Sequence, residues 1–266
     1  MSTMTVEPIE REQRSDIDEP TRAVQAPQLR KGTYRPDRDD GGCGMNVVSV
    51  YSGEVKITDY PSCAAPPLSR LVQILNDDYA DEDGLLAPTE SNVVLAIAAL
   101  TVGTGSSSMS VVRAWVAEVL SNPSWGMATA PLDPSSTKAL NVLAEALSAR
   151  ARGRRLSRLQ LARLQRQLQP IAQVPDLHRI AECALQVLTA ETVPAAHMGA
   201  ERIAEIVVAH SVSLRQFTTA AIWAWRHLAG VAGADVPTLT TLHAAARKLL
   251  SRTDHAPKLR TKEIQP

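Results

Sequence analysis

From Pro66 onward the apolar residues recur at helical spacing, and this periodicity constrains the fold more than any other feature. Prolines and short polar segments interrupt it where a helix has to end. In 67–78, the residues that share one helical face are Leu68, Leu71, Val72 and Leu75. The pattern predicts an all-α fold with a helical-bundle core of about nine helices, at 67–78, 89–102, 111–120, 136–151, 155–169, 176–190, 194–209, 213–229 and 238–252.

A stretch near 45–60 departs from this periodicity. Its valines alternate with polar residues on both sides of Ser52-Gly53, which predicts a small β-hairpin with a tight turn. Cys43 and Cys63 flank the stretch, so two ordinary thiols, a disulfide or a metal pair are all compatible with the spacing. We favour two thiols, because no histidine lies at metal-ligand spacing, and three cysteines in the chain indicate a reducing compartment.

Composition divides the chain into five segments. Residues 1–42 are rich in charge and proline and poor in large apolar side chains, so burial cannot offset the entropy of ordering them. A Pro/Gly/Ser-rich stretch at 123–134 predicts a linker. The predicted order is a disordered N-terminal arm at 1–42, the hairpin plus an N-terminal helical subdomain at 43–122, the linker at 123–134, a basic C-terminal helical subdomain at 135–252, and a flexible tail at 253–266.

The formal net charge is zero, but the two halves of the chain are oppositely charged. Residues 1–147 hold 20 acidic and 11 basic side chains, whereas residues 148–266 hold 8 acidic and 17 basic ones. This asymmetry suggests an anionic partner for the basic half, or head-to-tail contact between copies. A solvated basic face explains it equally well.

The basic residues concentrate in 150–170, RARGRRLSRLQLARLQRQLQP, which has seven arginines and no acid. On a helix its leucines share one side and most of its arginines lie opposite. Arginine suits phosphate, because its guanidinium can bond two oxygens at once. We therefore expect an RNA- or DNA-facing surface, the alternative being a face neutralised by acids of the N-terminal half. The candidate residues are Arg154, Arg155, Arg158, Arg163 and Arg166.

A second stretch, SVSLRQFTTAAIWAWRHLAG at 211–230, holds the single phenylalanine and two of the four tryptophans. Ser213 predicts the helix start, and Phe217 and Trp225 share a face that Trp223 does not. Arg215 falls in the first turn, where the helix end is already positive, so a nearby anion would explain it.

This stretch resembles the coat proteins of flexible filamentous plant viruses, the potexvirus group. The resemblance rests on Arg215-Gln216-Phe217, Trp223 and Pro237, although Ala224 replaces the usual asparagine and no aromatic residue follows Pro237. It implies a structural RNA-binding coat protein or nucleoprotein that polymerises into a helical capsid around genomic RNA. It further implies Arg215 in an RNA-backbone pocket, single-stranded RNA and further copies as partners, and a location in the virion and host cytoplasm.

The sequence contains no recognisable catalytic or metal-binding motif. The six histidines show no metal spacing, and neither GxSxG nor a P-loop is present, so we expect no enzyme, no metal and no cofactor. No apolar run is long enough to cross a membrane. Two other functions remain open: a helical protein-protein interaction module, such as a bacterial effector or adaptor without nucleic acid, and a DNA-binding regulator.

Overall fold

The computed structural model describes residues 27–32, 34 and 42–253, which fold mostly into helices. The all-α prediction is confirmed. The described part contains ten α-helices and no strand, together with the short 3-10 turns η1 (Met127–Thr129) and η2 (Gln169–Ile171). The α-helices are α1 (Gly44–Tyr51), α2 (Pro66–Asp78), α3 (Pro88–Thr101), α4 (Met109–Ser121), α5 (Pro134–Ala151), α6 (Arg158–Gln167), α7 (Pro175–Thr189), α8 (Val193–Val208), α9 (Leu214–Leu228) and α10 (Leu239–Thr253).

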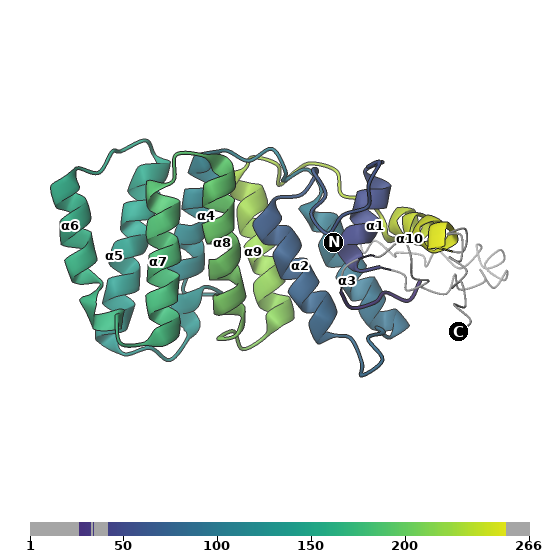
Figure 1. The fold of residues 1–266 in the computed structure, drawn as a ribbon, viewed down its shortest axis with the longest axis horizontal. Helices are drawn as coiled ribbons and strands as arrows, with labels where there is room; N and C mark the ends of the chain where they lie inside the picture. Colours follow the sequence, from purple (N-terminus) through teal and green to yellow (C-terminus); the bar gives the residue numbers. More distant parts are fainter. Residues whose placement is uncertain (1–26, 33, 35–41, 254–266) are drawn as a thin grey trace, which may run out of the picture.

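The helices form an elongated row in which the chain runs out and back (Figure 1). It leads from α1, α2 and α3 near one end through α4 and α5 to α6 at the other end. It then returns through α7, α8 and α9, so that α7 packs on α5 and α8 packs on α4 and α2. The last helix, α10, packs against α1 and α3. Helices from the two ends of the described chain are therefore neighbours.

The helix starts follow from local chemistry. Five helices carry proline in the first turn, where its missing N–H costs no helical bond: α2, α3, α5, α7 and α8. The side chains of Ser108, Asp133, Ser157 and Ser213 accept backbone N–H groups at the starts of α4, α5, α6 and α9. These signals explain why periodicity and prolines predicted most helices to within a few residues.

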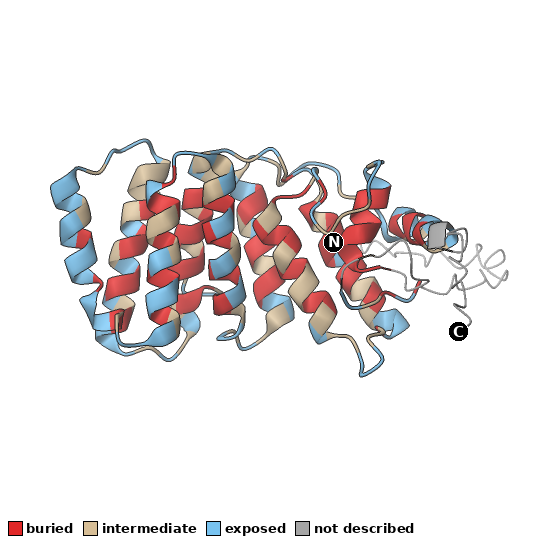
Figure 2. Ribbon diagram, viewed as in Figure 1, coloured by how far each residue is buried: buried red, intermediate tan, exposed pale blue. Residues whose placement is uncertain are grey.

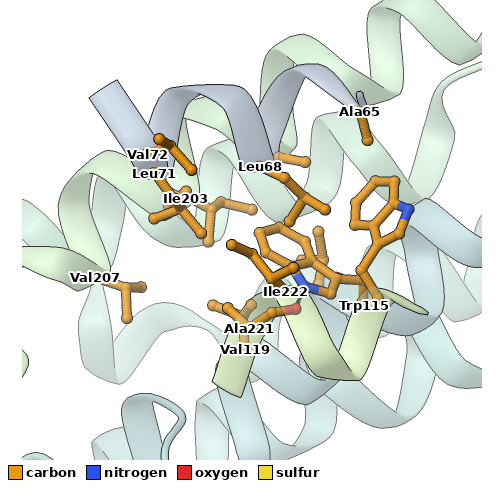
Figure 3. Packing of buried hydrophobic residues seen from close by; sticks show 14 of the residues in the cluster. Ala65, Leu68, Leu71, Val72, Trp115, Val119, Ile203, Val207, Ala221 and Ile222 are labelled. Atoms are coloured by element: carbon orange, nitrogen blue, oxygen red, sulfur yellow. Dashed lines mark hydrogen bonds between the residues drawn. The ribbon is translucent and has the colours of Figure 1, made fainter. Parts of the chain in front are cut away.

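One hydrophobic cluster extends along the row (Figure 2). It includes Met127 in the 123–134 connection, whose flanking helices α4 and α5 pack directly on one another. Figure 3 shows its middle, where Leu68 and Leu71 of α2 approach Ile203 of α8 and Ile222 of α9. The predicted division into two helical subdomains stays a prediction.

The predicted hairpin at 45–60 is wrong. Residues Gly44–Tyr51 form α1, whose first seven residues are all buried. Two of the polar residues in the alternating pattern, Asn46 and Ser49, do not face solvent. Asn46 donates to the Asp59 carboxylate (2.8 Å), and Ser49 donates to the Glu54 carboxylate (2.9 Å). Buried, hydrogen-bonded polar residues therefore imitated the exposed positions of a strand.

The thiols near this segment are free, as are all cysteines of the chain. The Cys63 sulfur lies 2.8 Å from the Ser52 hydroxyl. Cys43 is buried next to Asp59, and burial raises the pKa of its thiol to about 12. A thiol held protonated in this way is a poor metal ligand and a poor nucleophile.

The prediction of a disordered arm over 1–42 fails for 27–32, which dock onto the connection between α2 and α3. The Leu29 side chain is buried, its N–H donates to the Ser91 hydroxyl (3.1 Å), and its carbonyl accepts from Leu86 N–H (3.0 Å). The Lys31 N–H donates to the Gly84 carbonyl (2.8 Å). The rest of the predicted arm (1–26, 33 and 35–41) and most of the predicted tail (254–266) lie outside the described residues.

This docking predicts a stability cost for a change in the segment expected to be disordered. Replacing Leu29 by Ala should lower the free energy of unfolding by about 2–3 kcal/mol, because it removes a buried side chain. The neighbouring exposed Gln28 provides the control, since Gln28→Ala should stay within about 0.5 kcal/mol. Denaturant unfolding measures both, and indistinguishable midpoints would show that 27–32 adds nothing to stability.

Candidate nucleic-acid interface

The arginine-rich segment forms the outer end of the row (Figure 1). It comprises the connection after α5 and the whole of α6, where Ser157 and Gln160 form a reciprocal capping box. The leucine side of α6 faces inward as predicted, with Leu164 buried in the helix and Leu168 buried at its end. Beyond these contacts α6 is largely exposed (Figure 2). The helix thus covers the end of the core and presents its polar face to solvent.

The predicted arginines of this segment are all exposed: Arg154, Arg155, Arg158, Arg163 and Arg166, together with Arg152. None of them makes an ion pair or side-chain hydrogen bond with any residue in the described ranges. No contact in the described ranges therefore supports the alternative hypothesis that acids of the N-terminal half neutralise these arginines. Six like charges on one short segment repel each other, and a polyanion would relieve that repulsion.

Arg215 lies elsewhere in the row. It is exposed in the first turn of α9, and its guanidinium has no ion pair in the described part of the chain. The helices α7 and α8 lie between α6 and α9 in the row (Figure 1). The structure therefore separates the predicted site residues into two places, the arginine segment and the start of α9.

Two aromatic residues of α9, Phe217 and Trp225, hold it in the core. The Trp225 ring meets the Trp115 ring edge-on, with centroids 5.2 Å apart, and both side chains are fully buried. The Trp115 indole N–H donates to the Ala221 carbonyl of α9 (2.8 Å). Phe217 packs on Trp125 in the α4–α5 connection, with ring centroids 5.8 Å apart. The predicted common face of Phe217 and Trp225 is buried, as the sequence indicated.

The next residue, Arg226, was not predicted to matter. It is fully buried, and its guanidinium donates to four backbone carbonyls at 2.8–3.0 Å: Leu100, Val102, Val231 and Ala234. Burial lowers its pKa. Arg113 on α4 is also buried and donates to the carbonyls of Val187 and Ala190 at the end of α7. One signal was available: Arg226 follows Ile222 by four residues and so lies in the apolar stripe of α9.

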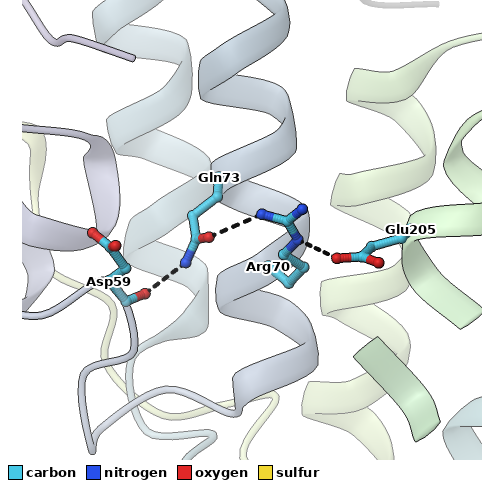
Figure 4. Close-up of polar contacts among 4 residues, drawn as sticks. All are labelled: Asp59, Arg70, Gln73 and Glu205. Carbon is cyan, nitrogen blue, oxygen red and sulfur yellow. Dashed lines mark hydrogen bonds and ion pairs between the residues drawn. The ribbon is translucent and has the colours of Figure 1, made fainter. Parts of the chain in front are cut away.

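A third kind of arginine environment joins α2 to α8 (Figure 4). Arg70 pairs with Glu205 at 2.6 Å and also donates to the Gln73 side-chain oxygen at 3.3 Å. Gln73 in turn donates to the Asp59 carbonyl (2.9 Å). Burial and the neighbouring Glu205 raise the pKa of Glu201 on the same face of α8. The charge of Arg70 is thus satisfied within the chain, unlike the charges of α6.

Other kinds of site find little support. No described helix has the length and apolarity that crossing a bilayer requires. Within the described ranges, no three His, Cys, Asp or Glu side chains gather where they could hold a metal ion. Comparison with models of protein families, with curated proteins and with solved structures finds no match.

The two arginines of α9 provide a matched pair for mutation. Replacing Arg226 by Met should lower the free energy of unfolding by about 3 kcal/mol or more, because four buried carbonyls lose their donor. Arg215→Met should change it by no more than about 0.5 kcal/mol, since that side chain is exposed. Thermal melts of the two variants measure these changes. If both variants lose the same stability, Arg215 has a structural role like that of Arg226.

His197 predicts a pH dependence. Its ring lies against Trp225, its Nε2 has no hydrogen-bond partner in the described part, and burial lowers its pKa. The His197 ring therefore takes up a proton less readily in the folded state than in the unfolded state. The stability of the fold does not suffer from this difference above about pH 6.5, where the ring is neutral in both states, and it is lost progressively as the pH falls below that value.

We therefore expect the parent to lose more melting temperature between about pH 7 and about pH 5 than His197→Gln does. His227→Gln, which removes an exposed histidine of α9, should retain the parent's full loss. A parent and a His197→Gln variant with parallel pH profiles would contradict the assignment.

Proposed function

We propose that this protein is a structural RNA-binding protein, of the coat protein or nucleoprotein kind, that assembles along single-stranded RNA. One observation carries the proposal: the exposed arginines of α6 and the preceding connection have no anionic partner in the described part of the chain. When arginines of this kind contact a phosphate backbone, they displace the counterions bound to the nucleic acid. The release of these counterions drives binding that does not depend on the base sequence.

The shape of the molecule supports the assembly part of the proposal. The arginine segment forms one end of the row, and the α2–α3 connection lies well away from it (Figure 1). That connection exposes Asp81, Glu82 and Asp83, next to the exposed Asp78 at the end of α2. A contact between unlike surfaces of successive copies propagates into a filament when its rotation does not close. In this function the protein would reside in the virion and the host cytoplasm.

Arg215 enters the proposal through the local resemblance to coat proteins of flexible filamentous plant viruses. Its exposed position at the start of α9 supports a backbone contact, since helix N-termini favour phosphate. It would form a second contact point, separate from the arginine segment.

A second candidate, a helical protein-protein interaction module, has one observation in its favour. Leu159, in the first turn of α6, is 83% exposed among the arginines. A large apolar side chain at such a position suits a protein partner better than a phosphate backbone.

Replacing Arg155, Arg158 and Arg166 by Gln tests the proposal. We expect RNA affinity to fall about equally for all sequences. The slope of log affinity against log salt should flatten by about 0.7 for each lost phosphate contact. Fluorescence titrations over a range of salt measure both, and electron micrographs of the same mixtures should show filaments with the parent and fewer with the variant.

Gln replacement of Arg179, Arg202 and Arg247 is the control, because these residues are also exposed and the net charge changes equally. If the two triple variants lose RNA affinity equally, the loss reflects the net charge of the protein and not a site at α6. A parent protein that does not bind RNA would overturn the proposal in favour of the interaction module.

A further inference from the structure

The outward face of α9 combines a cation with an exposed aromatic ring. Its exposed side chains include Arg215, Gln216, Trp223 and His227, with Thr219 half-buried between them. Their spacing of about four residues places them along one side of the helix. The helix contains no Asp or Glu, so no acid of α9 itself opposes an anion on this face.

Trp223 is the most exposed tryptophan of the chain. Trp115 and Trp225 are fully buried and Trp125 is half-buried, whereas Trp223 is 38% exposed. Its indole is the largest of the exposed hydrophobic side chains in the described ranges, and it offers a flat aromatic face to solvent.

The ring of Trp223 is held in place before any ligand arrives. The guanidinium carbon of Arg226 lies 5.7 Å from the ring centroid, close enough for a cation–π contact. Arg226 is itself fixed by its four bonds to backbone carbonyls. The His227 ring lies at the side, with centroids 6.4 Å apart. A fixed ring loses little entropy when a second flat group stacks on it.

The spacing of Arg215 and Trp223 along the helix axis suits an extended strand. Arg215 precedes Trp223 by eight residues, which corresponds to about 12 Å along a helix. Proteins that bind single strands combine a cationic track for the backbone with aromatic rings on which the bases stack. The bases of a duplex are paired and stacked on each other, so they cannot use such a ring.

We propose that Trp223 is a base-stacking site for single-stranded RNA, with Arg215 holding the backbone on the same face of α9. This inference rests on the proposed function and extends it from charge attraction to recognition of unpaired bases. The arginine segment then binds any polyanion, whereas α9 distinguishes a strand with free bases from one without them.

The test compares two probes, a short oligouridylate and inorganic polyphosphate, which carries the charge but no base. Trp223→Ala should weaken oligouridylate binding about ten-fold, which corresponds to ~1.4 kcal/mol, and leave polyphosphate binding unchanged. Trp223→Phe should retain most of the affinity, because it keeps a flat ring. Tyr51→Ala removes an aromatic side chain of equal exposure (39%) from α1 and should change neither affinity.

The outcomes separate this inference from the proposed function. A parent that does not bind oligouridylate overturns both. A parent that binds it with the affinity of Trp223→Ala overturns the stacking site alone, as does an equal loss for both probes. If Trp223→Ala does not fold, tryptophan emission decides: oligouridylate should quench the parent more than Trp223→Phe, and equal quenching would overturn the inference. If this face binds a protein instead of RNA, Trp223→Ala should leave the affinity for both probes unchanged, and that result would also overturn the inference.

Discussion

The path of this chain depends on the buried guanidinium of Arg226. It pairs with no carboxylate in the described part of the chain and instead donates to carbonyls at the end of α3 and in the connection that leads from α9 to α10. The C-terminal ends of α3 and α9 therefore converge on one cation, which offsets the negative ends of both helix dipoles. Because α3 belongs to the outgoing part of the chain and α9 to the returning part, this side chain links the two parts, in addition to the packing of α8 and α9 on α2 and α4.

Arginines of this protein differ in function because they differ in environment. Arg113 and Arg226 are buried among carbonyl oxygens, Arg70 is paired with Glu205, and those of α6 face solvent without a partner in the described ranges. Burial of an unpaired charge is costly, so a buried arginine has to be satisfied by the fold itself. An exposed one costs little and remains available. Environment, more than the number of arginines, is what supports the proposal that the α6 end binds an external anion.

Helix positions and the exposure of the α6 arginines could be predicted from the sequence, because both follow from spacing within a few residues. The hairpin could not be excluded, since the alternation of residue types does not reveal that Asn46 and Ser49 are buried and hydrogen-bonded to Asp59 and Glu54 of the same stretch. Arg226 lies in an apolar stripe, but two of its acceptors precede it by more than a hundred residues, which no local pattern indicates. The separation of Arg215 from α6 depends on the order of helices in the row, and that order is set by tertiary packing alone.

The neighbouring positions of α1 and α10 have a consequence for how the chain folds. Their contact joins residues from nearly opposite ends of the described chain, so it closes a loop that contains all the helices from α2 to α9. Closing so long a loop costs entropy that contacts between successive helices, such as α4 with α5 or α7 with α8, do not. The α6 end of the row can therefore begin to assemble from local pairs during synthesis, whereas the end formed by α1 and α10 is completed only after α10 has emerged.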